Sequence, residues 1–276
     1  MEKIFFVLTF LFLTSCSSSR IDRKIDDLSQ DSLADESFLR WGDERLRKAS
    51  GSNQKVISCY QGKSKDTLSS FKKDFLTHGK SQYYWLHIGN CYFIQESWTK
   101  AEFFYRMALD ETKVSTVKSI ALNNLGLIYF KYEQWEKGKE ALLKSMLLSS
   151  SFKVPRYNLS QLYLQFGLYD LAIEVLSGSA FKGHKDIDIF FSLANAYLFK
   201  GDLESASIFF QLIPVDQFRR EDIAATYALF LIKNNKIKDA LAIMKHRNRS
   251  GVPEITAISQ KIEKILLQRM KEDYEN

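Results

Sequence analysis

The sequence predicts an all-α protein built from stacked helix hairpins. The 276 residues include only 3 Pro and 12 Gly, while 45% are hydrophobic and 14% aromatic. Helix interiors tolerate few prolines and glycines, so this composition favours helices. A sequence pattern also recurs about every 34 residues, which is typical of repeat proteins. The chain is long enough for one large domain or a repeat array with a sizeable core.

The first residues predict a signal peptide over residues 1–15. Lys3 provides a positive start, and an apolar stretch of about ten residues then leads to Thr14, Ser15 and Cys16. A permanent membrane helix needs roughly 20 apolar residues, so this stretch is too short to span a bilayer. The alternative is an ordinary cleavable signal in which Cys16 has no role.

The stretch Leu13-Thr14-Ser15-Cys16 resembles the lipobox of bacterial lipoproteins. The resemblance implies cleavage before Cys16, with a diacylglycerol on its thiol and an acyl chain on its new amine. Several acyl chains anchor a soluble domain stably. Ser17 is not the aspartate that enteric bacteria use to retain lipoproteins in the inner membrane. The resemblance therefore favours the outer membrane, facing the periplasm. Residues 16–33 are rich in Ser and Asp, so we expect them to form a flexible tether between the lipid and the domain.

Residues 34–81 are expected to be helical. Within them, Leu68, Phe71, Phe75 and Leu76 form an apolar stripe at helical spacing. This region is interpreted either as a degenerate first repeat or as an N-terminal cap.

Residues 82–252 contain five copies of one pattern. Each copy has an apolar residue, a small residue and an aromatic residue, followed nine residues later by another small residue. The copies are Ile88, Gly89, Tyr92 and Ala101; Leu125, Gly126, Tyr129 and Gly138; Leu159, Ser160, Tyr163 and Ala172; Leu193, Ala194, Tyr197 and Ala206; and, more weakly, Tyr227, Ala228, Leu231 and Ala240. The last small residues are spaced by 37, 34, 34 and 34 positions.

This spacing predicts a pair of helices in each copy. The first three positions of the pattern lie on one helix face. The later small residue falls early in a second helix, where a larger side chain would hold the two helices apart. Turn signals lie between them at Gly167, Gly201 and Asn234-Asn235, whereas Glu96 and Glu133 occupy that position in the first two copies.

The pattern and its period resemble the tetratricopeptide repeat. The resemblance implies antiparallel helix pairs stacked into a right-handed superhelical solenoid. Residues 253–276 then fit a C-terminal capping helix, since solenoids need to cover their last apolar face. The apolar residues at helical spacing are Ile255, Ile258, Ile262, Ile265, Leu266 and Met270.

In proteins with this repeat, the first helix of each pair lines a concave groove that binds a protein or peptide. Aliphatic and aromatic side chains interleaved with amides would suit an extended or helical peptide. The alternative is that Phe93, Phe130 and Leu198 simply pack against neighbouring helices. The implied partner-binding residues are Leu86, Asn90, Phe93, Asn123, Leu127, Phe130, Tyr157, Gln161, Leu164, Phe191, Asn195 and Leu198.

The sequence carries no pattern for catalysis, a metal or a cofactor. The four histidines have no second ligand at helical metal spacing, and HExxH, CxxC and G-x-S-x-G are absent. The stretch Gly62-Lys63-Ser64 is not a phosphate-binding loop, because Ile57 stands where the first glycine is needed. A non-enzymatic protein without cofactors is expected.

The charge and the cysteines constrain the partners. The net charge is +6, from 39 basic and 33 acidic residues. The basic residues near the C-terminal end fit either an anionic lipid or glycan surface or solvated helix faces, and export makes nucleic acid an improbable partner. The basic residues are Arg219, Arg220, Lys233, Lys236, Lys238, Lys245, Arg247 and Arg249.

Cys59 and Cys91 are expected to be two buried small residues, although an oxidising compartment would permit them to pair.

These observations predict a lipid-anchored scaffold at the periplasmic face of an envelope membrane. Residues 121–176 are similar to the tetratricopeptide lipoproteins that act as pilotins for type IV pilus secretins. That similarity implies a secretin subunit as the partner. Alternatives are an adaptor for outer-membrane protein assembly or cell-wall enzymes, and a module that binds peptidoglycan or envelope polyanions. The oligomeric state stays open.

Overall fold

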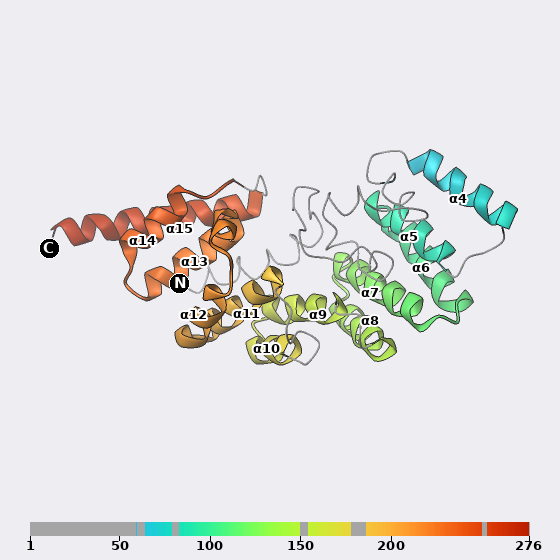
Figure 1. Cartoon of the computed structure of the whole chain (residues 1–276), viewed down its shortest axis with the longest axis horizontal. Helices are drawn as coiled ribbons and strands as arrows, with labels where there is room; N and C mark the ends of the chain where they lie inside the picture. Colours follow the sequence, from blue (N-terminus) through green and yellow to red (C-terminus); the bar gives the residue numbers. More distant parts are fainter. Residues whose placement is uncertain are drawn as a thin grey trace. The chain divides into compact units, whose positions relative to one another are not determined.

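The protein is built from α-helices, as a computed structural model shows (Figure 1). The structure describes Cys59 and residues 64–78, 83–149, 154–177, 186–249 and 253–275. Within these ranges, β interactions are limited to one isolated bridge between Arg220 and Asn248. The predicted signal peptide, Cys16, the tether and the helical stretch before Cys59 lie outside the described residues.

The helices follow one another as antiparallel pairs joined by short turns, with one helix before the pairs and one after them. This arrangement confirms the predicted fold class. The elements are α4 (Ser64–His78), α5 (Tyr84–Ile94), α6 (Trp98–Glu111), α7 (Ser115–Lys131), α8 (Trp135–Leu148), α9 (Val154–Gln165), α10 (Tyr169–Ser177), α11 (Ile187–Lys200), α12 (Leu203–Gln211), the 3₁₀ helix η4 (Val215–Arg219), α13 (Glu221–Lys233), α14 (Ile237–Lys245) and α15 (Pro253–Glu275).

The chain forms two compact units that divide within α9, between Leu159 and Ser160. The N-terminal unit contains α4 to α8 and the start of α9. The C-terminal unit contains the rest of α9 and the helices up to α15. No feature of the sequence pattern marks this division, because the repeat continues through it.

Each hairpin turns at one residue in the left-handed backbone conformation. At Glu96 and Glu133, φ is 57°, the same value as at Asn235. The following amide reaches back to the first helix, as in the bond from Ser97 N to Tyr92 O of 2.9 Å, which satisfies a carbonyl at the helix end. The glutamates therefore serve in turns where glycine would be less strained. The other turns use Gly167 and Gly201.

The two helices of each hairpin meet at the small residue that the repeat pattern singles out. Ala101, Ala172, Ala206 and Ala240 are each completely buried. The contact is closest at Gly138, where an added Cβ would lie 2.1 Å from the ring of Phe130. No side chain fits there without displacing that ring.

The helix α15 covers the last hairpin, as a capping helix should. Its residues Ile258, Ile262 and Leu266 are buried in a core shared with α13 and α14. Ion pairs hold the same junction, since Arg247 contacts Glu221 at 3.3 Å and Glu263 at 2.7 Å. The side chains of Arg247 and Glu221 are only 8% and 0% exposed, so each charge needs the other to offset its loss of water.

None of the helices that the structure describes combines the length and the apolar character required to cross a membrane.

The close contact at Gly138 generates a test of the hairpin packing. We expect Gly138→Ala to lower the free energy of unfolding by about 1–3 kcal/mol, because the methyl group would overpack the space that the ring of Phe130 fills. Urea unfolding measures the change. The control is Lys137→Ala in the same helix, an exposed site where about 0.5 kcal/mol or less is expected. Equal stability of the two variants would contradict the packing argument.

Candidate partner-binding face

The first helices of successive hairpins are neighbours within each unit. We call their shared surface the first-helix face. In the N-terminal unit it comprises α5, α7 and the start of α9, and in the C-terminal unit the rest of α9, α11 and α13. Hydrogen bonds between side chains of consecutive first helices define it, and they differ between the two units.

A chain of buried amides crosses the first-helix face of the N-terminal unit. Asn158 donates to Asn123 at 2.8 Å, Asn123 to Asn124 at 3.0 Å, and Asn124 to Asn90 at 3.1 Å. The hydroxyl of Tyr105 in α6 also donates to the Asn90 oxygen, at 2.9 Å. All four asparagines are buried, so each bond replaces water that the amide has lost. The chain therefore fixes the register of α5, α7 and α9.

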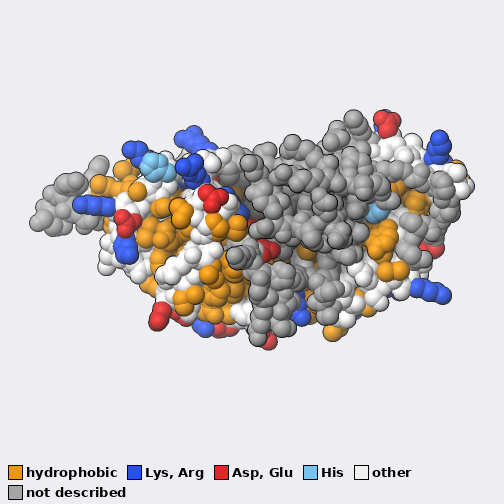
Figure 2. Space-filling model, in the orientation of Figure 1, with side chains coloured by type: hydrophobic (Ala, Val, Ile, Leu, Met, Phe, Trp, Pro, Cys, Tyr) orange, Lys and Arg blue, Asp and Glu red, His pale blue; other side chains and the backbone are white. Residues whose placement is uncertain are grey.

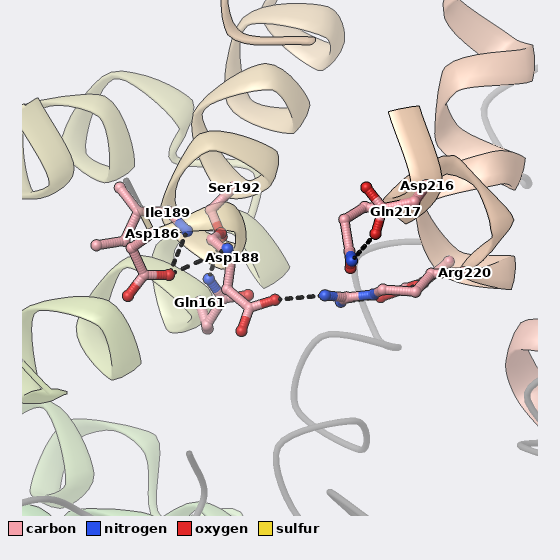
Figure 3. Close-up of polar contacts among 9 residues, drawn as sticks. Gln161, Asp186, Asp188, Ile189, Ser192, Asp216, Gln217 and Arg220 are labelled. Carbon is pink, nitrogen blue, oxygen red and sulfur yellow. Dashed lines mark hydrogen bonds and ion pairs between the residues drawn. The ribbon is translucent and has the colours of Figure 1, made fainter. Parts of the chain in front are cut away.

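A different polar chain links the first helices of the C-terminal unit, and Figure 3 shows its members. Gln161 in α9 donates to the hydroxyl of Ser192 in α11 at 2.8 Å, and that hydroxyl donates to the backbone oxygen of Asp188 at 2.7 Å. The carboxylate of Asp188 then accepts from Arg220 at 3.0 Å. The side chains of Asp188 and Arg220 point toward one another and join the start of α11 to the start of α13.

Arg220 is held between two carboxylates. Besides Asp188, it contacts Asp222 with two bonds of 3.2 and 2.8 Å, a fork geometry suited to a guanidinium. Burial acts to lower the pKa of Arg220, but the charges and hydrogen bonds of Asp222 and Asp188 outweigh it and raise the pKa. The arginine that the sequence grouped with a basic surface is therefore part of an internal ion-pair network.

The chains leave some amide groups on this face without a hydrogen-bond partner. Among the described residues, neither amide atom of Asn195 is bonded, although the residue is fully buried. The amide oxygens of Asn158 and Gln161 are also unbonded. A buried amide without a partner costs about 1–3 kcal/mol, so these groups hold unused bonding capacity.

The predicted partner-binding residues all lie on first helices, and most of them are buried. Tyr157 is half-buried, whereas the other predicted residues are at most 7% exposed. Their part in binding a partner stays a prediction. The buried residues are Leu86, Asn90, Phe93, Asn123, Leu127, Phe130, Gln161, Leu164, Phe191, Asn195 and Leu198.

Two of the predicted aromatic residues pack inside their own hairpins. The ring of Phe93 meets Trp98 edge-on at 5.0 Å, and the ring of Phe130 stacks on Trp135 at 5.9 Å. These contacts agree with the alternative that the sequence left open for both residues. Substituting an acidic residue at either position would disturb the hairpin as well as any bound partner.

Some side chains of the first helices keep access to solvent. Tyr157, Leu229, Asp188 and Asp222 are each half-buried. They combine an aromatic ring, an aliphatic chain and carboxylates, but no nucleophile paired with a base. The described residues also include no group of three or more His, Cys, Asp and Glu that could hold a metal ion.

Sequence reasoning missed a polar column that follows the repeat. The residue directly before the first apolar position is polar in all five copies and buried in each. Its spacing equals that of the small residues, so the five copies of the repeat pattern already contained this signal. The members are His87, Asn124, Asn158, Ser192 and Thr226.

A disulfide joins Cys59 to Cys91 in α5, with the Cα atoms 5.4 Å apart. The expectation of two unpaired residues is therefore wrong. Cys59 packs against Phe71 and Ile88 in one apolar cluster, and this brings its sulfur onto α5. The spacing of the cysteines in the chain gave no means of seeing this contact.

Comparisons with known proteins identify the fold. No protein-family model matches the sequence, and a search of curated proteins finds no match. A tetratricopeptide repeat protein from Parabacteroides merdae aligns with 80% of this chain and 88% of its own, at 17% identity and a TM-score of 0.58. The C-terminal part of a repeat protein from Cytophaga hutchinsonii aligns with 76% of this chain and 80% of its own, at 13% identity and a TM-score of 0.55. A double mutant of MamA aligns with 65% of this chain and 95% of its own, at 14% identity and a TM-score of 0.52. The chain therefore has the tetratricopeptide-repeat fold.

The polar column contains one group whose burial makes stability depend on pH. Burial lowers the pKa of His87 to about 4, and its ring lies against Phe71 and Tyr83. Because the folded pKa is below the unfolded value of about 6.5, the folded state resists protonation. Stability is complete above the unfolded pKa and falls as the pH drops from about 6.5 to about 4.

We expect this residue to lower the free energy of unfolding of the N-terminal unit by as much as about 3 kcal/mol across that range. His87→Asn, which places the residue of the next two copies at this position, should reduce the slope. Urea unfolding of both proteins between these pH values gives the difference. Parallel pH curves would show that His87 ionises as freely in the folded protein as in the unfolded chain.

Proposed function

We propose that the protein is a lipid-anchored scaffold of the bacterial cell envelope that holds a protein partner on its first-helix face. The observation that carries the scaffold function is the tetratricopeptide-repeat fold, which supports protein–protein interaction. Within each unit, neighbouring first helices offer a surface for a peptide or helix of the partner. The half-buried Tyr157 and Leu229 are the apolar contacts that a partner could reach without unfolding a hairpin.

The anchor rests on the lipobox resemblance of Leu13-Thr14-Ser15-Cys16. The disulfide between Cys59 and Cys91 supports export independently, because disulfides persist in oxidising compartments. Ser17 favours the outer membrane as the destination. In this proposal the acylated Cys16 holds the repeats at the periplasmic face, and a tether gives them access to partners nearby.

The partner class that we propose is a subunit of a secretin-type machine, such as that of a type IV pilus. This finer proposal rests on the similarity of residues 121–176 to pilotin lipoproteins. An envelope anchor and a peptide-binding repeat surface are the two properties that an escort for such a subunit requires. Adaptors for outer-membrane protein assembly or for cell-wall enzymes have the same two properties, so the identity of the partner decides between them.

The anchor is tested at Cys16. We expect Cys16→Ser to abolish incorporation of labelled palmitate and to move the protein from the membrane fraction to the soluble periplasmic fraction. Ser17→Ala is the matched control, because it leaves the acceptor cysteine in place and should keep both properties. Unchanged labelling in Cys16→Ser would refute the lipoprotein proposal, whatever the protein binds.

The binding face is tested by site-specific photo-crosslinking in cells, since a crosslinker at a half-buried position disturbs packing less than a charge. We expect Tyr157 and Leu229 on first helices to give adducts with an envelope protein, identified by mass spectrometry. Leu147 and Leu171, exposed on second helices, are the matched controls in the two units and should give none. Adducts from the second helices alone would place the partner on the opposite face.

A further inference from the structure

Two short segments meet at one edge of the C-terminal unit, and a third leads into them. The end of η4 meets residues 245–249 after α14, and the end of α12 leads into η4 along the chain. The amide of Asn248 donates to the oxygen of Arg219 at 2.7 Å, and a bridge pairs Asn248 with Arg220. We call this the α12–α14 edge. These backbone contacts fix the segments that carry the surface side chains of the edge.

The edge separates structural cations from surface cations. Arg220 and Arg247 turn inward and bind the carboxylates described above. Arg219, Lys245 and Arg249 are exposed, and within the described residues none of them forms an ion pair. Three positive charges with no internal partner thus remain at the surface of this edge.

Exposed apolar side chains lie in the segment that leads to Arg219. Val215 is 86% exposed and Leu212 is 48% exposed, both at the point where Pro214 follows the end of α12. A 3₁₀ helix rises about 2 Å per residue, so Val215 is within about 8 Å of Arg219 along η4. Figure 2 shows Lys and Arg side chains gathered over α14 and α15, with hydrophobic side chains beside them.

Other charged or titratable groups of the edge are few. Asp216 is exposed in η4 and accepts a hydrogen bond from Gln217 at 2.8 Å. His246 is exposed at the end of α14. The single carboxylate offsets one of the three surface cations, so Arg219, Lys245 and Arg249 leave the edge with a positive charge.

We propose that the α12–α14 edge docks on an anionic phospholipid surface. Cations attract anionic headgroups, while exposed aliphatic side chains enter the boundary between headgroups and acyl chains. A soluble anionic polymer would use the cations but would gain nothing from Leu212 and Val215. The proposal rests on the envelope anchor proposed above, which would keep the edge close to a membrane, but the docking surface is made by different residues.

The test is co-sedimentation of the purified full chain with vesicles of phosphatidylcholine, alone or mixed with phosphatidylglycerol, at low and high salt. We expect the chain to prefer the anionic vesicles, and the preference to weaken at high salt. The triple variant Arg219→Glu, Lys245→Glu and Arg249→Glu should lower that preference by at least about tenfold. Any binding by the predicted signal segment is the same in the wild-type chain and in the triple variant, so the difference between these two proteins reports on the edge.

The matched control reverses three cations of the same hairpin at its opposite end, with Lys233→Glu, Lys236→Glu and Lys238→Glu. These residues are exposed around the turn between α13 and α14. The control changes the net charge by the same amount and should keep most of the preference. Equal losses in both triple variants would show an effect of net charge alone and overturn the proposal.

A second variant separates a membrane from a soluble polyanion. Leu212→Ser with Val215→Ser leaves every charge in place and should still weaken binding to anionic vesicles, because it removes the inserted apolar groups. Wild-type binding by this variant would overturn membrane docking in favour of a purely electrostatic site. Circular dichroism checks that each variant is folded.

The acyl state of Cys16 in the same preparations is measured by mass spectrometry, and it separates the two proposals. A preference for anionic vesicles without acylation would leave the docking edge standing and remove the anchor. Acylation of Cys16 with no preference for anionic vesicles would leave the anchor standing and remove the docking edge.

Discussion

The tightest constraint in the structure is the short distance between the two helices of each hairpin. A small residue at the start of each second helix permits that distance, and at Gly138 even one methyl group would collide with Phe130. Once the helices of a hairpin meet this closely, the left-handed turns at Glu96 and Glu133 follow, because a tight hairpin needs that backbone whichever residue supplies it. Consecutive hairpins can then stack with their first helices side by side. The first-helix face therefore depends on the small residues near the start of the second helices.

The polar chains on that face add specificity more than stability. A hydrogen bond between buried amides contributes about 1 kcal/mol net, and an apolar contact of the same shape could match it. What an apolar contact could not do is fix the register, since a slip of one residue would leave Asn90 and Asn124 unbonded in an apolar interior. Asn195 is fully buried and neither of its amide atoms is bonded among the described residues, so its side chain adds no such constraint on the register.

Much of the fold follows from local patterns, and the parts that did not follow depend on contacts across the chain. Ala172, Ala206 and their equivalents predicted the helix pairs because helix spacing is a local property. The direction of Arg220 was not predictable in this way, since a run of basic residues reads as a solvated surface until Asp188, 32 positions earlier, is known to face it. The disulfide has the same cause: Cys59 and Cys91 are separated by 32 positions, and their proximity depends on the cluster around Phe71. The burial of Phe93 against Trp98 was left open in the sequence for the same reason.

The distribution of charge in the C-terminal unit also bears on what its surfaces can recognise. Of the eight basic residues that the sequence groups there, Arg220 and Arg247 are committed to internal carboxylates. Removing Arg247 would leave the buried charge of Glu221 without its ion-pair partner. Removing Arg220 would leave the half-buried carboxylates of Asp188 and Asp222 without theirs, so neither arginine is free to exchange its partner for a ligand. Recognition of an anion must therefore use the exposed cations at the edges, whereas the first-helix face presents aliphatic, aromatic and amide groups around a fixed ion pair. In the two proposals above, a protein partner and a lipid surface would thus contact different residues of the same unit. A scaffold of this kind could hold a partner while it is bound to a membrane.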